Sequence, residues 1–341
     1  MARSCRLGPQ ARLVAPASLL LALGLGLLVS CRGTAYVGTE SSSGGLGAGG
    51  AMLGVVGDAG PPFAGVGGGL VSHLPPGFAA AEVGGFQLGP AIVQGEAGAT
   101  GDPGEPSEGE CGNILLGEVR DFKGENEPGG HPDFEVFLSQ VATPHLVRLA
   151  LGGDLKPAYA SLCEAGSALD PQACPHGPET TTQVNFDEWY RNTTGKNLAY
   201  LAYFWFEPQP NGQFLFNSSS FFPLDDAGFG NTPGFAHNCL FTTELHTKFK
   251  YSGGETFEFT GDDDVWVFIN RHLAVDLGGV HERQGSQIDL DASATELGIS
   301  KGNVYALDLF QADRHTAFST FRILTNLAFV NCGFLEPPVV K

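Results

Sequence analysis

The chain has 341 residues and a formal net charge of −19, from 18 Lys and Arg against 37 Asp and Glu. This acidity argues against a nucleic-acid partner, because binding to phosphates needs a basic surface. Acidic exported proteins commonly work beside divalent cations or neutral sugars, although acidity also serves solubility.

Residues 1–31 are predicted to be an export signal of the lipoprotein type. Three arginines precede an apolar run over residues 13–29, and Leu-Val-Ser-Cys follows at residues 28–31. This tetrapeptide looks like a lipobox, in which Cys31 would be lipidated. An uncleaved anchor and ordinary cleavage after Ala35 are the alternatives. We therefore expect an exported chain, held by a lipid anchor at the outer membrane or cell surface, with secretion as the alternative.

Residues 32–110 are predicted to form a disordered Gly-rich tether. Glycine and short apolar residues dominate this stretch, and neither a strand period nor a helix period is sustained. Such a composition cannot bury enough apolar surface to offset the entropy of ordering.

Residues 111–333 are long enough for one sizeable domain, followed by a C-terminal tail at 334–341. Short strand-like runs recur between turn signals, which predicts an all-β fold, an antiparallel β-sandwich with long loops and short helical turns. Strands are expected at 114–122, 198–206, 239–251, 256–260, 265–269, 304–310 and 318–329. Helical turns are expected at 186–190 and 293–297, and long loops at 152–182 and 217–238.

Five cysteines lie beyond the export segment, in what should be an oxidising compartment. Cys163 and Cys174 bracket a loop rich in Gly, Pro and Ala, and a bridge there would contribute about 3 kcal/mol in the chain-entropy model. Cys111 and Cys332 stand near the domain ends and could clamp the termini. Cys239 is expected to be a buried free thiol. The odd count leaves other pairings open.

Three consecutive aspartates, Asp262, Asp263 and Asp264, precede a strand-like run at 265–269 whose two alternating faces are both apolar. In a regular strand the first and third would share one face. Adjacent carboxylates repel unless water or a cation screens them, and Ca²⁺ takes about 6–8 oxygen ligands. Aiming Asp262 and Asp263 at one ion would require a bulge or a cis peptide bond. A solvated acidic turn is the alternative.

The string FTTELHTKFKYSGGETFEFTGDDDVWVFIN, followed by DLGGVH, closely resembles the fibro-slime domain of secreted bacterial and slime-mould proteins. That family is similar in turn to the protective-antigen-type β-sandwich, which includes yeast flocculin adhesins. The resemblance spans about residues 113–330. Further matching pieces lie at 120–122, 131–134, 186–190, 221–225 and 313–316.

The resemblance implies a calcium site. In the wider superfamily two aspartates joined by a cis peptide hold Ca²⁺, and the ion receives sugar hydroxyls. The pair aligns with Asp262 and Asp263 here, and Asp313, from a loop that faces the pair in the superfamily, could complete the shell. Three neighbouring polar residues are the candidate ligand contacts: Asp264, Arg314 and His315.

Other residues near the acid run are expected to be structural. Asp276 and His281 flank two glycines that indicate a tight turn. The family usually has Asn-Gly after the buried strand, whereas this chain has Asn270 and Arg271, so a longer turn or another turn type is expected. Core or solvated-turn roles are expected for Trp189, Trp205, Trp266, Asp225 and Asp226.

No catalytic set is evident in the sequence. It contains no Gly-x-Ser-x-Gly elbow and no His-Glu-x-x-His motif. The two carboxylates of a glycosidase face each other from separate positions, whereas contiguous aspartates suit an ion better. We expect a surface-anchored, calcium-dependent carbohydrate-binding or adhesion module with a glycan partner. The alternative is a structural matrix module whose calcium, if present, only rigidifies a loop.

Overall fold

The computed structural model describes residues 85–92, 113–135, 141–316 and 318–331. The export signal with Cys31, the Cys111–Cys332 pair and the tail at 334–341 lie outside these residues. Within the described part of the chain, no helix is both long enough and apolar enough to cross a membrane.

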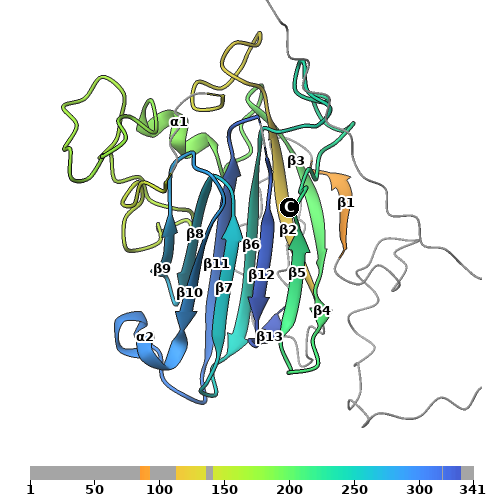
Figure 1. The fold of residues 1–341 in the computed structure, drawn as a ribbon, viewed down its shortest axis with the longest axis vertical. Helices are drawn as coiled ribbons and strands as arrows, with labels where there is room; N and C mark the ends of the chain where they lie inside the picture. The colour runs from red at the N-terminus through yellow and green to blue at the C-terminus, as the bar shows by residue number, and fades with distance from the viewer. Residues whose placement is uncertain (1–84, 93–112, 136–140, 317, 332–341) are drawn as a thin grey trace, which may run out of the picture. The chain divides into compact units, whose positions relative to one another are not determined.

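Two antiparallel sheets form the fold, which confirms the all-β prediction (Figure 1). The larger sheet has the order β1-β3-β2-β6-β11-β8-β9, with β13 pairing with β6. Its strands are β1 (Phe86–Ala91), β2 (Ile114–Phe122), β3 (Asn197–Trp205), β6 (Phe241–Lys250), β8 (Asp264–Ile269), β9 (His272–Leu277), β11 (Val304–Asp313) and β13 (Ala328–Asn331).

The smaller sheet has the order β10-β7-β12-β5-β4. Its strands are β4 (Glu207–Pro208), β5 (Phe214–Ser218), β7 (Thr256–Gly261), β10 (Gln284–Asp289) and β12 (Phe321–Thr325). Two short helices, α1 (Gln183–Glu188) and α2 (Leu290–Leu297), lie at the predicted helical turns and start at the side-chain caps Thr182 and Asp289.

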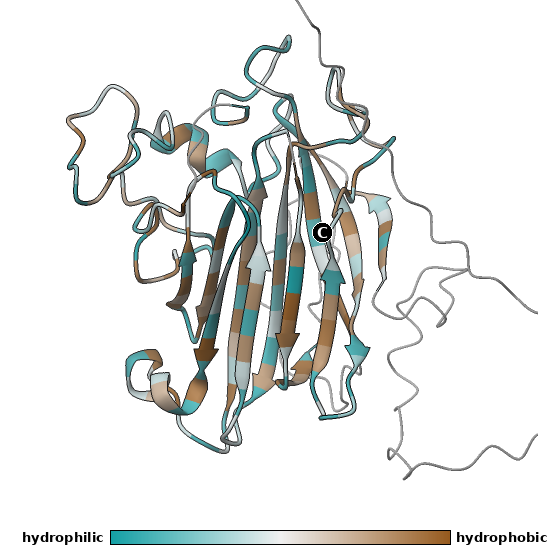
Figure 2. Cartoon of the chain, viewed as in Figure 1, coloured by the Kyte–Doolittle hydropathy of each residue, from teal (hydrophilic) through white to brown (hydrophobic). Residues whose placement is uncertain are grey.

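Strand β8 is buried on both faces, as its sequence predicts. Val265, Val267 and Ile269 face the inner core between the two sheets, where alternating apolar side chains of both sheets meet. Trp266 and Phe268 face the other way into a second core. Figure 2 shows the resulting apolar and polar bands along the strands. The strand is therefore the shared wall of two hydrophobic clusters.

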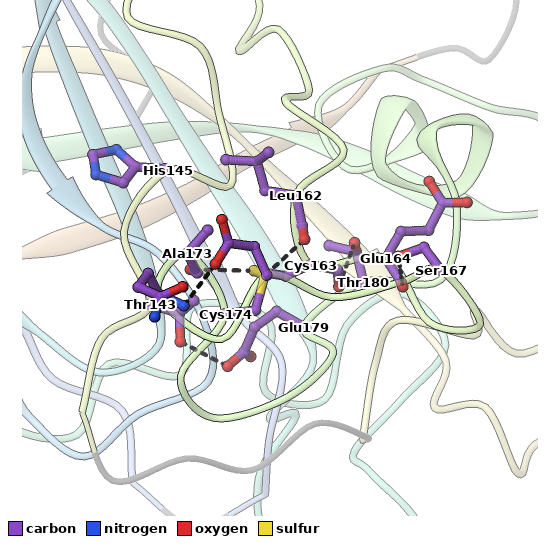
Figure 3. The surroundings of a disulfide bond; sticks show 12 residues. Thr143, His145, Leu162, Cys163, Glu164, Ser167, Ala173, Cys174, Glu179 and Thr180 are labelled. Carbon is purple, nitrogen blue, oxygen red and sulfur yellow. Dashed lines mark hydrogen bonds between the residues drawn. A yellow bond between two sulfur atoms is a disulfide. The ribbon is translucent and has the colours of Figure 1, made fainter.

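The second core lies on the outer face of the larger sheet, under the long segment that precedes β3. Phe186 stacks on Tyr159 and packs against the tilted ring of Trp189, with ring centroids 4.9 Å and 4.8 Å away. The predicted Cys163–Cys174 disulfide is present, with Cα atoms 5.5 Å apart, and fixes this segment (Figure 3). The segment expected to be a loop at 152–182 thus packs over the outer face of the larger sheet, and we call it the covering segment.

The predicted tether at 32–110 is wrong for part of its length, because β1 lies inside it. This strand pairs with β3 at the edge of the larger sheet, and Phe86 packs against Phe204 and Phe221 with centroids 5.3 Å and 5.4 Å away. One aromatic side chain entering the core outweighs the poor strand propensity of the Gly-Pro pair beside it. The folded domain therefore begins before residue 111.

The turn after β8 also differs from expectation. Asn270 and Arg271 join β8 to β9 as a two-residue turn, and both have positive φ, 50° and 67°. Arg271 tolerates this conformation because its backbone oxygen accepts a hydrogen bond from Leu151 and its guanidinium donates to Gly152 O at 3.0 Å. The covering segment thus holds the turn in place.

A buried ion network lies on the outer face of the larger sheet. Glu244 accepts hydrogen bonds from Arg120 (2.8 Å), Lys156 and His246, and His246 also contacts Asp308 at 2.6 Å. Burial alone would lower the pKa of His246, but the Glu244 and Asp308 carboxylates outweigh it and raise the pKa to about 9. Glu244 is therefore the carboxylate that Arg120, Lys156 and His246 share, while Glu118 lies 2.9 Å from Arg120 and Asp308 contacts His246.

Replacing Glu244 by Gln should destabilise the fold strongly, because it leaves these cations without their shared counter-charge. We expect a loss of about 3–5 kcal/mol in the free energy of unfolding, measured by denaturant titration. The matched control is Glu258→Gln, which breaks the partly exposed pair with Arg322 and should cost less than about 1 kcal/mol. Equal losses in the two variants would contradict the assignment.

The inclusion of β1 in the domain is tested by Phe86→Ala. This side chain is only partly buried, so we expect a loss of about 1–2 kcal/mol, below the 3–5 kcal/mol typical of a fully buried phenylalanine. The exposed Phe235 provides the control, since Phe235→Ala should leave the unfolding midpoint nearly unchanged. Identical midpoints for both variants and the wild type would show that β1 contributes nothing to stability.

Candidate functional site

The three aspartates lie where the chain crosses from one sheet to the other. Strand β7 of the smaller sheet ends at Gly261, and β8 of the larger sheet begins at Asp264. Asp264 pairs with Ala312 on β11, so Asp313, the last residue of β11, lies at the same end of the sandwich. We call this the acid end; α2 lies at the opposite end (Figure 1).

Asp263 breaks the strand alternation, but without the cis bond that the resemblance implies. No cis peptide occurs among the described residues, and Asp263 instead has a φ of 57° in the left-handed region. Asp is one of the few non-glycine residues that adopt this region readily. Its carboxylate accepts hydrogen bonds from the backbone N–H of Arg314 (2.7 Å) and of His281 (3.3 Å). Of the two predicted ways to break the alternation, the cis bond is therefore wrong, and a left-handed residue redirects the side chain instead.

Asp262 and Asp313 are buried with unsatisfied oxygens. Within the described residues, Oδ2 of Asp262 and both carboxylate oxygens of Asp313 lack a hydrogen-bond partner. The Ser319 hydroxyl lies beside Asp313 without forming a well-aligned bond. Buried polar atoms are rarely left unpartnered, and such an atom marks strain, function or a missing ion or water.

The three carboxylates of Asp262, Asp263 and Asp313 repel one another. Burial first, and then the charges of Asp264 and Asp262, raise the pKa of Asp263 to about 8. Burial and the charge of Asp263 raise the pKa of Asp313 well above its usual range. Burial also raises the pKa of Asp262, against hydrogen bonds from Thr320. Burial and charge repulsion thus link these three carboxyls, and we refer to the cluster of Asp262, Asp263 and Asp313 as the acid pocket.

The donor chemistry of the acid pocket fits a hard divalent cation. The unpartnered atoms of Asp262 and Asp313 are carboxylate oxygens, the ligands that Ca²⁺ prefers, and the unpartnered Ser319 hydroxyl beside Asp313 is a further oxygen. No group of three or more His, Cys, Asp or Glu in the described segments already surrounds a common point as metal ligands. Backbone carbonyls, water or the hydroxyls of a ligand would therefore have to complete a shell. The assignment of Asp262, Asp263 and Asp313 to calcium stays a prediction.

Asp264 and Arg314 form a fully buried ion pair beneath the pocket, with Arg314 Nε 2.6 Å from Asp264 Oδ2. The Gly279 N–H donates to the other Asp264 oxygen at 2.6 Å. Arg314 also donates to Glu179 O at 3.1 Å and stacks over Trp189 at 4.4 Å. Their predicted contact with a ligand remains untested, and their burial favours a structural role.

His315 is the predicted contact residue that reaches solvent. Its side chain is 28% exposed and lies 3.8 Å from Glu135, which also accepts a hydrogen bond from the Thr316 hydroxyl at 2.7 Å. Glu135 itself has a φ of 70°, and its N–H donates to Arg314 O at 2.7 Å. The structure thus brings Asp262, Asp263, Asp313 and His315 to one end.

Two carboxylates that support this end escaped the sequence reasoning. Asp133 accepts hydrogen bonds from Thr181 and from Trp189 Nε1 at 3.1 Å. Glu179 accepts from the Thr143 hydroxyl at 2.9 Å, and burial raises its pKa to about 7 (Figure 3). The His-Pro-Asp-Phe piece was a signal for Asp133, whereas nothing in the local sequence marks Glu179.

Several residues expected to be structural are buried or hydrogen-bonded within the fold. Asp276 accepts hydrogen bonds from Trp266 Nε1 (3.1 Å) and from the His145 N–H (2.8 Å). His281 is buried, and its ring nitrogens lie 3.2 Å and 2.7 Å from the backbone oxygens of Leu277 and Glu282. Trp189 and Trp266 are wholly buried, and Cys239 is a buried free thiol.

Part of the chain is similar to a known domain family. Residues 194–336 match the PA14 domain. The PA14 match contains the whole acid pocket, whereas β1, β2 and most of the covering segment precede it. It agrees with the protective-antigen-type part of the predicted resemblance, while the fibro-slime assignment stays a prediction.

Similar proteins occur in Dictyostelium discoideum. Protein psiR is 35% identical over 234 residues, covering 62% of this chain and 22% of that protein. Protein psiB is 44% identical over 213 residues, covering 58% of this chain and 34% of that protein. The chain thus spans well under half of the length of these relatives.

Among solved structures, a PA14 sugar-binding domain from an RTX adhesin aligns with a TM-score of 0.26 at 10% identity, covering 62% of this chain and 89% of that one. The PA14 domain of the MpAFP antifreeze protein aligns with a TM-score of 0.24 at 12% identity, covering 38% and 79%.

Because the pKa of Asp263 is raised in the folded state, we predict that the stability of the fold depends on pH when divalent cations are absent. The folded-state pKa of Asp263, about 8, lies above its ordinary value of 3.8, so folding favours the protonated form. Its stabilising contribution is full below about pH 4 and is lost as the pH rises through 8. We expect the thermal midpoint in a chelator to fall over this range.

The control for this pH dependence is Asp263→Asn, which should flatten the slope. A residual slope should remain, because burial also raises the pKa values of Glu179 and Asp121 to about 7. An unchanged slope in the variant would show that Asp263 is not the titrating group.

Proposed function

We propose that this chain is a carbohydrate-binding module that binds its ligand at the acid end in a calcium-dependent manner. The observation that carries the proposal is the acid pocket, in which Asp262 and Asp313 bury unpartnered carboxylate oxygens. The match of residues 194–336 to the PA14 domain supports the ligand class, since the PA14 domain of the RTX adhesin is a sugar-binding domain.

Asp262, Asp263 and Asp313 would hold the ion. When bound, Ca²⁺ would supply positive charge and open coordination positions that vicinal sugar hydroxyls can occupy. The backbone N–H groups of Arg314 and His281 fix the Asp263 carboxylate through both of its oxygens. The chain therefore orients the carboxylate before any ligand arrives, which reduces the entropy lost on binding.

A binding role suits this pocket better than catalysis does. Asp262 and Asp263 are adjacent, and the carboxyls of the pocket raise one another's pKa values. A glycosidase instead holds two carboxyls about 5–10 Å apart across the scissile bond. The export signal predicted at residues 1–31 would direct the module out of the cell. Lipidation of Cys31 would then anchor it to a membrane for adhesion.

The proposal is tested by calorimetry with Ca²⁺ and by glycan-array binding with and without a chelator. Asp262→Asn and Asp313→Asn keep the side-chain shape but remove charge, so each should weaken Ca²⁺ binding at least tenfold and abolish glycan binding. Asp226→Asn is the matched control, since this aspartate lies in an exposed acid pair on a loop of the same end. That variant should bind Ca²⁺ and glycan like the wild type.

Two outcomes would contradict the proposal. Absence of Ca²⁺ binding at millimolar concentration would remove the ion from the site. Calcium binding that stabilises the domain without any chelator-sensitive glycan binding would favour the alternative, a structural module in which the ion only rigidifies the acid end.

A further inference from the structure

The exposed phenylalanines are distributed unevenly over the described residues. Phe229, Phe235 and Phe318 are 37%, 49% and 78% exposed, and no other phenylalanine in the described ranges is exposed to this degree. All three lie in connections at the acid end, between β5 and β6 or between β11 and β12. The exposed Val304, in contrast, begins β11 at the opposite end.

Phe318 is the member of this set that is adjacent to the acid pocket. The next two residues contact the pocket, because the Ser319 hydroxyl lies beside Asp313 and Thr320 hydrogen-bonds with Asp262. The Phe221 N–H also donates to Ser319 O at 2.9 Å. The backbone that carries Phe318 is therefore tied to the pocket and to the start of the neighbouring loop.

The other two phenylalanines are engaged locally. Phe229 lies under the Lys123 ammonium, 4.8 Å from its ring centroid. The Phe235 N–H donates to Thr232 O at 2.9 Å within its own turn. Of the three, only Phe318 has a mostly exposed side chain and immediate neighbours in sequence that contact Asp262 and Asp313.

Isolated exposed apolar side chains are common on proteins and need no special reason. The position of Phe318 is nevertheless specific, because the next three residues, 319–321, are all buried and Phe321 enters the inner core. An exposed aromatic ring whose neighbours in sequence contact buried carboxylates offers a type of contact that the carboxylates lack. An aromatic face packs against apolar C–H groups, whereas the carboxylates provide only charge and hydrogen-bond acceptors.

We propose that Phe318 is a specificity-determining contact whose ring packs on the apolar C–H face of the bound sugar. The site would then take a pyranose that combines a pair of vicinal hydroxyls with an adjacent face of axial C–H groups. Open-chain polyols and other diols without such a face would bind more weakly. This inference rests on the proposed carbohydrate-binding function and names the substrate class within it.

The test uses the full chain and a glycan chosen from the array by its binding to the wild type. Phe318→Ala should weaken glycan binding about tenfold, and Phe318→Leu should weaken it less, because it keeps apolar area without an aromatic face. Phe318→Trp should keep or strengthen binding, and its indole fluorescence should shift to shorter wavelength as glycan is added. Glycerol serves as a diol probe that lacks the ring and should bind the wild type and Phe318→Ala equally.

Two controls separate this contact from effects on the ion or the fold. Calcium affinity, measured by calorimetry without sugar, should stay within twofold of the wild type in every Phe318 variant. Val304→Ala removes another exposed apolar group, 40% exposed against 78% for Phe318, at the other end of β11 and should leave glycan affinity unchanged.

The possible failures are distinguishable. Full glycan affinity in Phe318→Ala, or no fluorescence response in Phe318→Trp, overturns the aromatic contact while the proposed function stands. Loss of calcium affinity in Phe318→Ala also overturns it, since the residue would then act by shaping the pocket. Absence of any glycan binding by the wild type refutes the proposed function and this inference together.

Discussion

The buried pair of Asp264 and Arg314 is the interaction on which the acid end depends. Burying two charges is costly and is offset only when geometry and further hydrogen bonds satisfy both groups. Here the Gly279 N–H donates to the carboxylate, and Arg314 Nη1 donates to Asp133 O and Glu179 O, while Nη2 of Arg314 has no hydrogen-bond partner among the described residues. The charge and hydrogen bonds of Asp264 keep the pKa of Arg314 raised against burial. The same arginine presents its backbone N–H to Asp263.

This pairing also explains why the acid pocket is left with excess charge. Nε and Nη1 of Arg314 donate to Asp264 and to backbone oxygens rather than to the carboxylates of Asp262 or Asp313. The pocket is tolerated because β8, directly behind it, is buried on both faces and supplies apolar contact to two cores. The apolar contacts of β8 thus stabilise the fold, whereas the buried carboxylates of the acid pocket destabilise it. Such local strain is common at functional sites.

The sequence predicted features that depend on neighbouring residues and missed those set by distant ones. The doubly apolar run at 265–269 and the bracketing of a loop by Cys163 and Cys174 are local patterns, and both predictions are confirmed. The role of Arg314 depends on Asp264, 50 positions earlier, and Glu179 lies 135 positions before it. Strand β1 was missed because its partner β3 supplies the packing, and the left-handed Asp263 because two backbone donors fix it.

If the proposed function holds, protons and Ca²⁺ compete for the same carboxylates. With a pKa of about 8, Asp263 is largely protonated at neutral pH when no cation is bound. Ca²⁺ requires ionised carboxylates, so binding must release protons, and the apparent affinity must increase with pH. Proton release can be measured by calorimetry in buffers of different ionisation enthalpy. Each Asp263 oxygen accepts from one backbone N–H, and a protonated carboxyl retains acceptor capacity, so ionisation requires no rearrangement of the backbone. On the proposed function, the carboxylates of the acid end would therefore exchange protons for Ca²⁺ without a movement of the backbone.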